Sequence, residues 1–220
     1  MMLNIREEFD RELINLQNEV LALGNMVETM LQDSVMYLKA RDFAGSERVI
    51  SQDSKVNHKR FRIEEDVFAM IALRQPKAID LRRIAAMLEF ASELERIGDY
   101  AKGIGKINLL IGGQKLMKPL IDLPRMCDIV RHMLRQVLTA FVRQDEELAR
   151  SIPPTDDEVD ALYNQIYREL ATYIMQDPKL LDQANYLLWA AHNLERTGDR
   201  TINLCERVVY MVTGELTELN

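Results

Sequence analysis

The sequence predicts an all-α protein built from long helices with few connections. Only nine glycines and six prolines occur among its 220 residues, whereas good helix formers are frequent. An antiparallel β protein would need many more turn residues than this. Apolar residues recur at spacings of three and four, which is the period of one helix face. With 47% apolar and 29% charged residues, the chain has the composition of a folded protein rather than a disordered one.

Three helices are predicted in the first half of the chain. Apolar residues at heptad spacing predict a helix over residues 5–40, and Asp42 is placed to cap a second helix that ends before Pro76. A third helix is expected to begin near Lys77 and to end at the glycine pair 112–113.

The same pattern begins again after a linker that extends to Pro119 or Pro124. A fourth helix is expected to end near Asp145, a fifth at Asp177, and a sixth to span about residues 179–212. The sequence therefore predicts two tandem three-helix bundles, made of six long antiparallel helices.

The entry of the fifth helix is interrupted by Pro153 and Pro154, which cannot donate backbone hydrogen bonds. Thr155 and Glu158 have the spacing of a capping box, which would restart the helix after the prolines. We therefore expect a bend beside Asp156.

The two halves are predicted to be an internal duplication, because specific residues recur in the same order. The repeats are expected at residues 1–112 and 113–220. Small insertions or deletions explain why the offset between matching residues drifts from 103 to 100. The matching sets are Asp42, Asp53 and Val56 with Asp145, Asp156 and Val159, and Leu94-Glu95-Arg96 and Gly98-Asp99 with Leu194-Glu195-Arg196 and Gly198-Asp199.

Acidic residues interrupt the apolar seams of these helices. Glu195 is the single charged position in an otherwise apolar or small register of the sixth helix, and Glu95 has the same place in the third. Asp53 lies on the seam of the second helix. An isolated ionised carboxylate in a core costs several kcal/mol unless a cation, an arginine or a metal compensates its charge. These carboxylates therefore need partners.

Each of these acidic positions belongs to a pair of oxygen-bearing residues four positions apart. Side chains at that spacing project from one helix face about 5–6 Å apart, so neighbouring helices could bring two pairs together in each half. Such sites suit Mg²⁺, Mn²⁺ or Ca²⁺ and also hold iron, and carboxylates alone do not select between Mg²⁺, Mn²⁺, Zn²⁺ and iron. The candidate metal ligands are Asp53, Asn57, Glu95 and Asp99 in the first half and Asp156, Asp160, Glu195 and Asp199 in the second.

Two structural alternatives stand beside the metal hypothesis. An acidic pair at this spacing is often only a solvated helix face, and Arg96 and Arg196 could close ion-pair networks between helices. Among the histidines, only His192 lies near a candidate ligand, and the Glu-x-x-His motif of di-iron bundles is absent from the sequence. Motifs of hydrolytic and phosphoryl-transfer enzymes are absent as well, so we expect no catalytic or cofactor-binding residues and no enzyme.

The net charge and the composition also exclude some classes of binding partner. A net charge of −7 has the wrong sign for nucleic-acid binding. No apolar run approaches the ~20 residues that cross a bilayer, and residues 1–10 lack the pattern of a secretory signal. We therefore expect a cytoplasmic protein without membrane insertion. Cys127 and Cys205 lack the spacing of a zinc or disulfide framework and are predicted to be small core residues.

The duplicated motif carries a family resemblance. Two copies of Leu-Glu-Arg-x-Gly-Asp, each on the last helix of a three-helix half, resemble the PhoU family over nearly the whole chain. The resemblance implies two tandem three-helix bundles and a cytoplasmic, commonly dimeric regulator of phosphate uptake. It also implies that the protein restrains phosphate-starvation signalling by contacting the ATPase subunit of the phosphate ABC transporter and a phosphate-sensing histidine kinase.

The resemblance further implies metal binding, because some family members hold metal clusters through paired Glu/Asp-x-x-x-Asp motifs that match the eight candidate ligands. Two departures concern the first half. Asn57 replaces a carboxylate, which predicts weaker cation binding there, and Gly103 stands where the second half has Asn203. The alternative function is a metal-binding or metal-buffering helical bundle without a signalling role.

Overall fold

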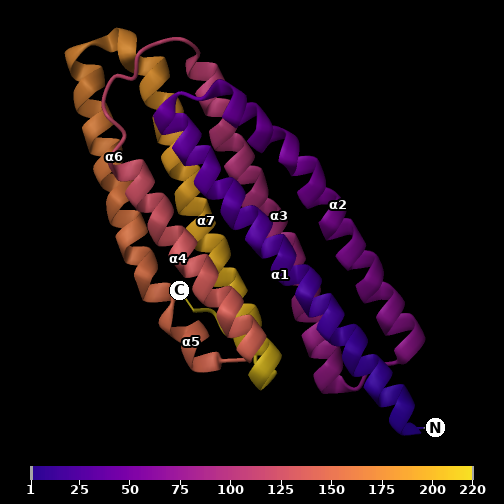
Figure 1. Ribbon diagram of the computed structural model, residues 1–220. Helices are drawn as coiled ribbons and strands as arrows, with labels where there is room; N and C mark the ends of the chain where they lie inside the picture. Colours follow the sequence, from indigo (N-terminus) through magenta and orange to yellow (C-terminus); the bar gives the residue numbers. More distant parts are fainter. Residues whose placement is uncertain (1, 220) are drawn as a thin grey trace.

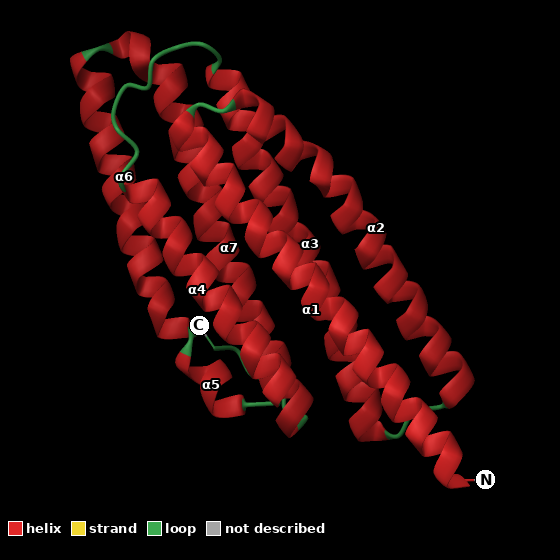
Figure 2. Ribbon diagram, viewed as in Figure 1, coloured by secondary structure: helices red, strands yellow, loops and turns green. Residues whose placement is uncertain are grey.

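The computed structural model of the protein describes residues 2–219, with side chains described from residue 6 onward. Within that range the chain consists of helices joined by loops, and no strand is present (Figure 2). The predicted all-α class is therefore confirmed. The first half contains α1 (Met2–Ala40), α2 (Phe43–Arg74) and α3 (Ala78–Ile111), and the second contains α4 (Asp122–Arg143), α5 (Glu146–Ser151), α6 (Asp156–Gln176) and α7 (Leu181–Thr213), with short 3₁₀ helices at Pro153–Thr155 and Pro178–Leu180.

The long helices lie side by side in an elongated bundle (Figure 1). One side of the bundle is made of α1, α2 and α3, and the other of α4, α6 and α7. The loop over residues 112–121 crosses from one half to the other at one end of the bundle. In the part of the chain that is described, no helix is long and apolar enough to cross a membrane.

Helix α1 ends, and helix α2 begins and ends, where the sequence predicts. The side chain of Asp42 accepts a hydrogen bond of 2.8 Å from the N–H of Gly45, so it caps the start of α2. At the other end, Gln75 adopts a left-handed conformation with φ of 46°, and its N–H donates to the carbonyl of Ile71. Pro76 follows and cannot continue the helix.

The predicted capping box before α6 is wrong. Thr155 has helical backbone angles, and its side chain accepts no capping hydrogen bond. Pro153 and Pro154 instead begin a 3₁₀ turn that leads directly into α6, because the fixed φ of proline suits the first turn of a helix. The expected bend is a complete break, since α5 already ends at Ser151.

A single apolar core runs through both halves. Phe90 and Ile97 of α3 are fully buried, and Phe90 stacks on Phe141 of α4 with 4.4 Å between the ring centroids. Burial of a side chain of this size contributes about 1.5–3 kcal/mol. Cys127 and Cys205 are buried, as predicted.

The division into repeats at residues 1–112 and 113–220 stays a prediction, and its terminal residues 1 and 220 lie outside the described part of the chain. The shared core is relevant to this division, because the apolar face of each half is covered by the other half. We therefore describe the two halves as parts of one folded unit.

The two halves meet through equivalent helices. The helix α3 packs along α7, and α1 packs along α4, so these two helices of the first half touch their own counterparts in the duplication. Tyr100 and Arg200 are equivalent residues, and the Nε of Arg200 lies 3.4 Å from the Oη of Tyr100. Equivalent residues that face each other indicate an approximate two-fold axis between the halves.

The contacts on either side of this axis are reciprocal. The Nδ2 of Asn203 donates to the Oε2 of Glu93 at 3.2 Å. In the reciprocal contact, Asn193 of the second half packs against Gly103 of the first half. A Cβ on residue 103 would lie 2.9 Å from the Asn193 Nδ2. Gly103 therefore leaves room for Asn193, and Asn203 contacts the other half of the chain.

Candidate metal centre in two unequal copies

The eight predicted ligands lie on two pairs of neighbouring helices. Because residues four apart share a helix face, each helix presents its pair on one side. The helix α2 packs along α3 and α6 packs along α7, which places two pairs beside each other in each half. Asp53 and Asn57 lie on α2 and Glu95 and Asp99 on α3, while Asp156 and Asp160 lie on α6 and Glu195 and Asp199 on α7.

A lysine lies among the carboxylates of the first half. The Nζ of Lys102 is 2.7 Å from the Oδ2 of Asp53 and 3.4 Å from the Oδ1 of Asp99. Asn57 donates from its Nδ2 to the same Asp53 oxygen at 3.3 Å. Asp53 is only 8% exposed, so this ammonium supplies the compensation that a buried carboxylate requires.

Glu95 completes the first-half site. Its pKa is raised, mainly by burial and then by the charge of Asp99, while Arg60 and Arg96 lower it. The Oδ1 of Asn57 is buried without a hydrogen-bond partner. The first half therefore combines three carboxylates with nearby cationic side chains.

The second half places four carboxylates together. The pKa of Asp156 is raised to about 7, first by burial and then by the charges of Asp160, Asp199 and Glu195. The Oδ1 of Asp156 and the Oε2 of Glu195 are buried and have no hydrogen-bond partner. A Cβ at Gly198 would overlap the Oδ1 of Asp156, so only glycine lets this carboxylate lie against α7.

Cationic compensation in the second half is limited. Arg196 Nη1 lies 2.7 Å from Asp199 Oδ2 on the same helix, which is an ion pair within α7. The Nδ1 of His192 lies 3.1 Å from the Oε2 of Glu195, without hydrogen-bond geometry. His192 is thus the histidine that lies near a candidate ligand, as predicted, whereas His58 and His132 are exposed.

Neither site forms a closed set of ligands. Among residues 6–219, no group of three or more His, Cys, Asp and Glu side chains lies close enough to hold one metal ion. Asp99 and Asp160 are exposed at the edges of their sites. The assignment of the eight residues as metal ligands therefore stays a prediction.

The residues that most distinguish the two sites were missed from the sequence. Lys102 contacts two predicted ligands, and the repeat offset of 100 places Ile202 at the equivalent position. Arg60, near Glu95, corresponds to Tyr163 at the offset of 103. Aligning the whole repeats, and not only their acidic residues, would have found both differences.

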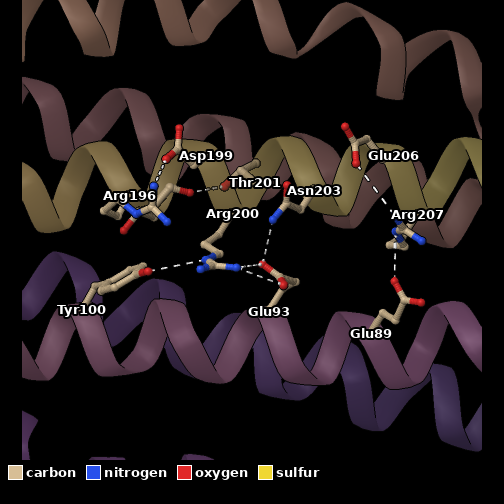
Figure 3. Close-up of polar contacts among 11 residues, drawn as sticks. Glu89, Glu93, Tyr100, Arg196, Asp199, Arg200, Thr201, Asn203, Glu206 and Arg207 are labelled. Atoms are coloured by element: carbon tan, nitrogen blue, oxygen red, sulfur yellow. Dashed lines mark hydrogen bonds and ion pairs between the residues drawn. The ribbon is translucent and has the colours of Figure 1, made fainter. Parts of the chain in front are cut away.

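A polar network joins α3 of the first half to α7 of the second (Figure 3). Arg200 of α7 reaches Tyr100 of α3, and its Nη1 lies 3.2 Å from the Oε2 of Glu93. Asn203 donates to the same carboxylate. Tyr100 directly follows the first-half ligand Asp99, and Arg200 directly follows Asp199, so this network joins the helices that carry both sites.

The second half offers more of the oxygen donors that a hard cation prefers than the first half does. Four carboxylates, two of them with buried oxygens that lack partners, offer the oxygen donors that Mg²⁺ or Mn²⁺ prefers. In the first half, Asn57 supplies a neutral oxygen, and the ammonium of Lys102 already contacts Asp53 and Asp99. A metal ion there would face a positive charge beside its ligands.

The sequence is similar to that of known proteins over nearly its full length. The family model for the PhoU domain matches residues 20–107 and again residues 123–208. A phosphate-specific transport system accessory protein PhoU homolog of Rhizobium meliloti is 36% identical over 96% of this chain and 90% of its own length. A phosphate-specific transport system accessory protein PhoU of Serratia marcescens is 37% identical over 96% of this chain and 87% of its own.

Solved structures have the same fold. The crystal structure of PhoU from Pseudomonas aeruginosa superposes with a TM-score of 0.89 at 33% identity, covering 94% of this chain and 100% of that chain. The phosphate transport system regulatory protein PhoU from Streptococcus pneumoniae superposes with a TM-score of 0.88 at 31% identity, covering 95% and 99%.

Proposed function

The chain belongs to the PhoU family, and on that premise we propose that it is an accessory protein of a phosphate-specific transport system. The observation that carries the proposal is similarity over nearly the whole chain to relatives of that description. Both halves take part in the match, so the proposal concerns the complete two-bundle unit. Its role is regulation of transport rather than catalysis.

The regulation is proposed to be negative. When phosphate is plentiful, the protein restrains phosphate uptake and the phosphate-starvation response by joining the ATPase subunit of the phosphate ABC transporter to the phosphate-sensing histidine kinase. It does so in the cytoplasm, as a homodimer, without binding nucleic acid or inserting into the membrane. The description of the Streptococcus pneumoniae relative as a regulatory protein supports a regulatory role, and the net charge of −7 argues against nucleic acid.

The second acidic site is proposed to hold a divalent cation such as Mg²⁺ or Mn²⁺, with Zn²⁺ or iron as further candidates. Once bound, the cation would supply the positive charge that the buried oxygens of Asp156 and Glu195 lack. The four carboxylates would then hold α6 against α7 instead of repelling one another. The residues that would bind it are Asp156, Asp160, Glu195 and Asp199.

Deletion of the gene tests the regulatory role. In phosphate-rich medium, loss of the protein should raise alkaline phosphatase or its equivalent, and expression of the wild-type chain should restore repression. Unchanged phosphatase after deletion would contradict the proposal. Co-purification at high and low phosphate should recover the transporter ATPase and the kinase, and light scattering should give the mass of a homodimer.

A metal-buffering bundle is the second candidate function, and the partnerless carboxylate oxygens of the second half favour it. The variant with Glu95, Asp99, Glu195 and Asp199 changed to Ala separates the two. A regulatory protein that needs its metal should lose both metal and repression in this variant. Normal repression without metal would make metal binding incidental to signalling.

A further inference from the structure

We propose that Lys102 is the built-in cation of the first acidic site and that its ammonium restricts metal binding to the second half of the chain. The proposal rests on the metal-binding part of the proposed function and deepens it, because it names the residue that makes the two copies of one motif unequal. It concerns the residues of this chain and not the family motif itself.

The position of Lys102 carries the proposal. Its side chain is 26% exposed, and its Nζ bridges Asp53 of α2 and Asp99 of α3 at 2.7 and 3.4 Å. These two carboxylates belong to the two helices whose acidic pairs would have to share a metal. The ammonium therefore occupies the place between the helices where a cation would bind.

The charge of Lys102 is firmly held there. Its Nζ donates hydrogen bonds to both carboxylates, at 2.7 Å to the Oδ2 of Asp53 and at 3.4 Å to the Oδ1 of Asp99. A metal ion could enter only by displacing this ammonium, which would separate it from Asp53, a residue that is 8% exposed. Entry of a metal ion would therefore remove the charge that compensates a buried carboxylate, which is unfavourable.

The second half lacks any equivalent of this cation. Ile202 stands at the position of Lys102 and is 6% exposed, so an apolar side chain is buried where the lysine would extend. In the same half, Asp156 and Glu195 keep buried carboxylate oxygens without hydrogen-bond partners. The exchange of lysine for isoleucine thus places a cation among the carboxylates of the first half and none at the equivalent position of the second.

The test begins with a chain in which the second site is disabled by Glu195→Gln and Asp199→Asn. This chain should bind Mn²⁺ weakly in equilibrium dialysis, because Lys102 still blocks the first site. Adding Lys102→Ile should raise Mn²⁺ affinity at least about tenfold, and further changes Glu95→Gln and Asp99→Asn should abolish the gain. Lys106→Ile removes the same charge from an exposed position one turn farther along α3 and should produce no gain.

Two further variants guard against misfolding. Lys102→Gln removes the charge while keeping a hydrogen-bond donor for Asp53, so it should fold and also gain Mn²⁺ binding. Lys102→Arg keeps the charge and should gain none. In chelator, the melting temperature of the Lys102→Ile chain should fall by about 4 °C, and Mn²⁺ should restore it.

The reciprocal exchange, Ile202→Lys in the otherwise wild-type chain, should weaken Mn²⁺ binding by the second half. The proposal is overturned if the first half binds Mn²⁺ while Lys102 is present, or if neither Lys102→Ile nor Lys102→Gln gains binding. Failure of the proposed regulation would instead appear as unchanged phosphatase after gene deletion. Gain of Mn²⁺ by Lys102→Ile, with none bound by the wild-type second half, would support the role of Lys102 and contradict the second-half metal site.

Discussion

The two halves carry nearly the same acidic motif in different electrostatic surroundings. In the first half, Lys102 contacts two of the carboxylates, whereas in the second half Ile202 is buried at the same position. The second half has one more carboxylate, Asp160 in place of Asn57. It also keeps buried carboxylate oxygens without hydrogen-bond partners, on Asp156 and Glu195.

This difference teaches that a repeated motif does not make a repeated site. The motif residues fix which carboxylates share a helix face, but residues outside the motif decide whether those carboxylates are already compensated. A buried ion pair and an uncompensated acidic cluster respond oppositely to the loss of a charge. The predictions below use that contrast.

The largest expected effect is on cation binding. Changing Glu195 to Gln and Asp199 to Asn should lower Mn²⁺ affinity by about 100-fold, because these residues are proposed ligands. Changing Glu95 to Gln and Asp99 to Asn should leave the affinity nearly unchanged. Isothermal titration measures both, and equal losses would remove the contrast between the halves.

The second largest expected effect is on stability, through the polar network that joins α3 to α7. Glu93→Ala should lower the free energy of unfolding by about 2 kcal/mol, because it removes the carboxylate that pairs with Arg200 and accepts from Asn203 in a largely buried place. Glu89, which pairs with Arg207, is half exposed, and Glu89→Ala should cost less than about 0.5 kcal/mol. Urea denaturation compares the two, and similar costs would show that the network contributes little.

The two motif glycines should respond differently to alanine. At Gly198 the added methyl would displace the Asp156 carboxylate, so Gly198→Ala should weaken Mn²⁺ binding by about tenfold. At Gly98 the nearest atom is the Val56 Cγ1 at 3.2 Å, which needs only a small shift. Gly98→Ala should leave Mn²⁺ binding unchanged while adding helix propensity of up to about 1 kcal/mol, and weakened binding in that variant would contradict the distinction.

The smallest effect is a pH dependence of stability without metal. The pKa of Asp156 is raised in the folded state to about 7 from 3.8, so the folded chain binds more protons between these values than the unfolded chain. Stability should therefore be greatest near pH 4 and fall as the pH rises through 7. Because Asp156 is partly exposed, its share is on the order of 1 kcal/mol after solvent screening.

The variant Asp156→Asn should flatten this slope in thermal melts recorded in chelator. Glu158→Gln, at an exposed position on the same helix, is the matched control and should keep it. An unchanged slope in the Asp156 variant would assign the pH dependence to other groups. Added Mn²⁺ should bind more tightly as the pH rises toward 7, because binding requires the deprotonated carboxylate.

The fold could be predicted from the sequence because its signals are local. Heptad spacing, the Asp42 cap and the Gln75-Pro76 end each act within one or two helix turns, and the structure confirms them. Thr155 does not cap α6, because Pro153 and Pro154 already supply a helical turn that makes a cap unnecessary. A cap pattern predicts a helix start only where the preceding residues are not themselves helical.

The candidate site was less predictable, because its character depends on contacts between helices. The pairing of carboxylates four residues apart could be derived from helix geometry alone. Whether Lys102 would reach back to Asp53, 49 positions earlier, depends on how α2 packs on α3. The meeting of Tyr100 with Arg200 likewise depends on how the halves pack.

The approximate two-fold relation between the halves has a consequence for the ancestry of the chain. Reciprocal contacts between equivalent helices are those of a symmetric dimer, here made of two copies joined by the loop over residues 112–121. Fusion puts both copies on one chain, so each can acquire substitutions that its twin lacks. Lysine at position 102 and isoleucine at 202 are such a divergence, and two identical subunits could never have encoded it.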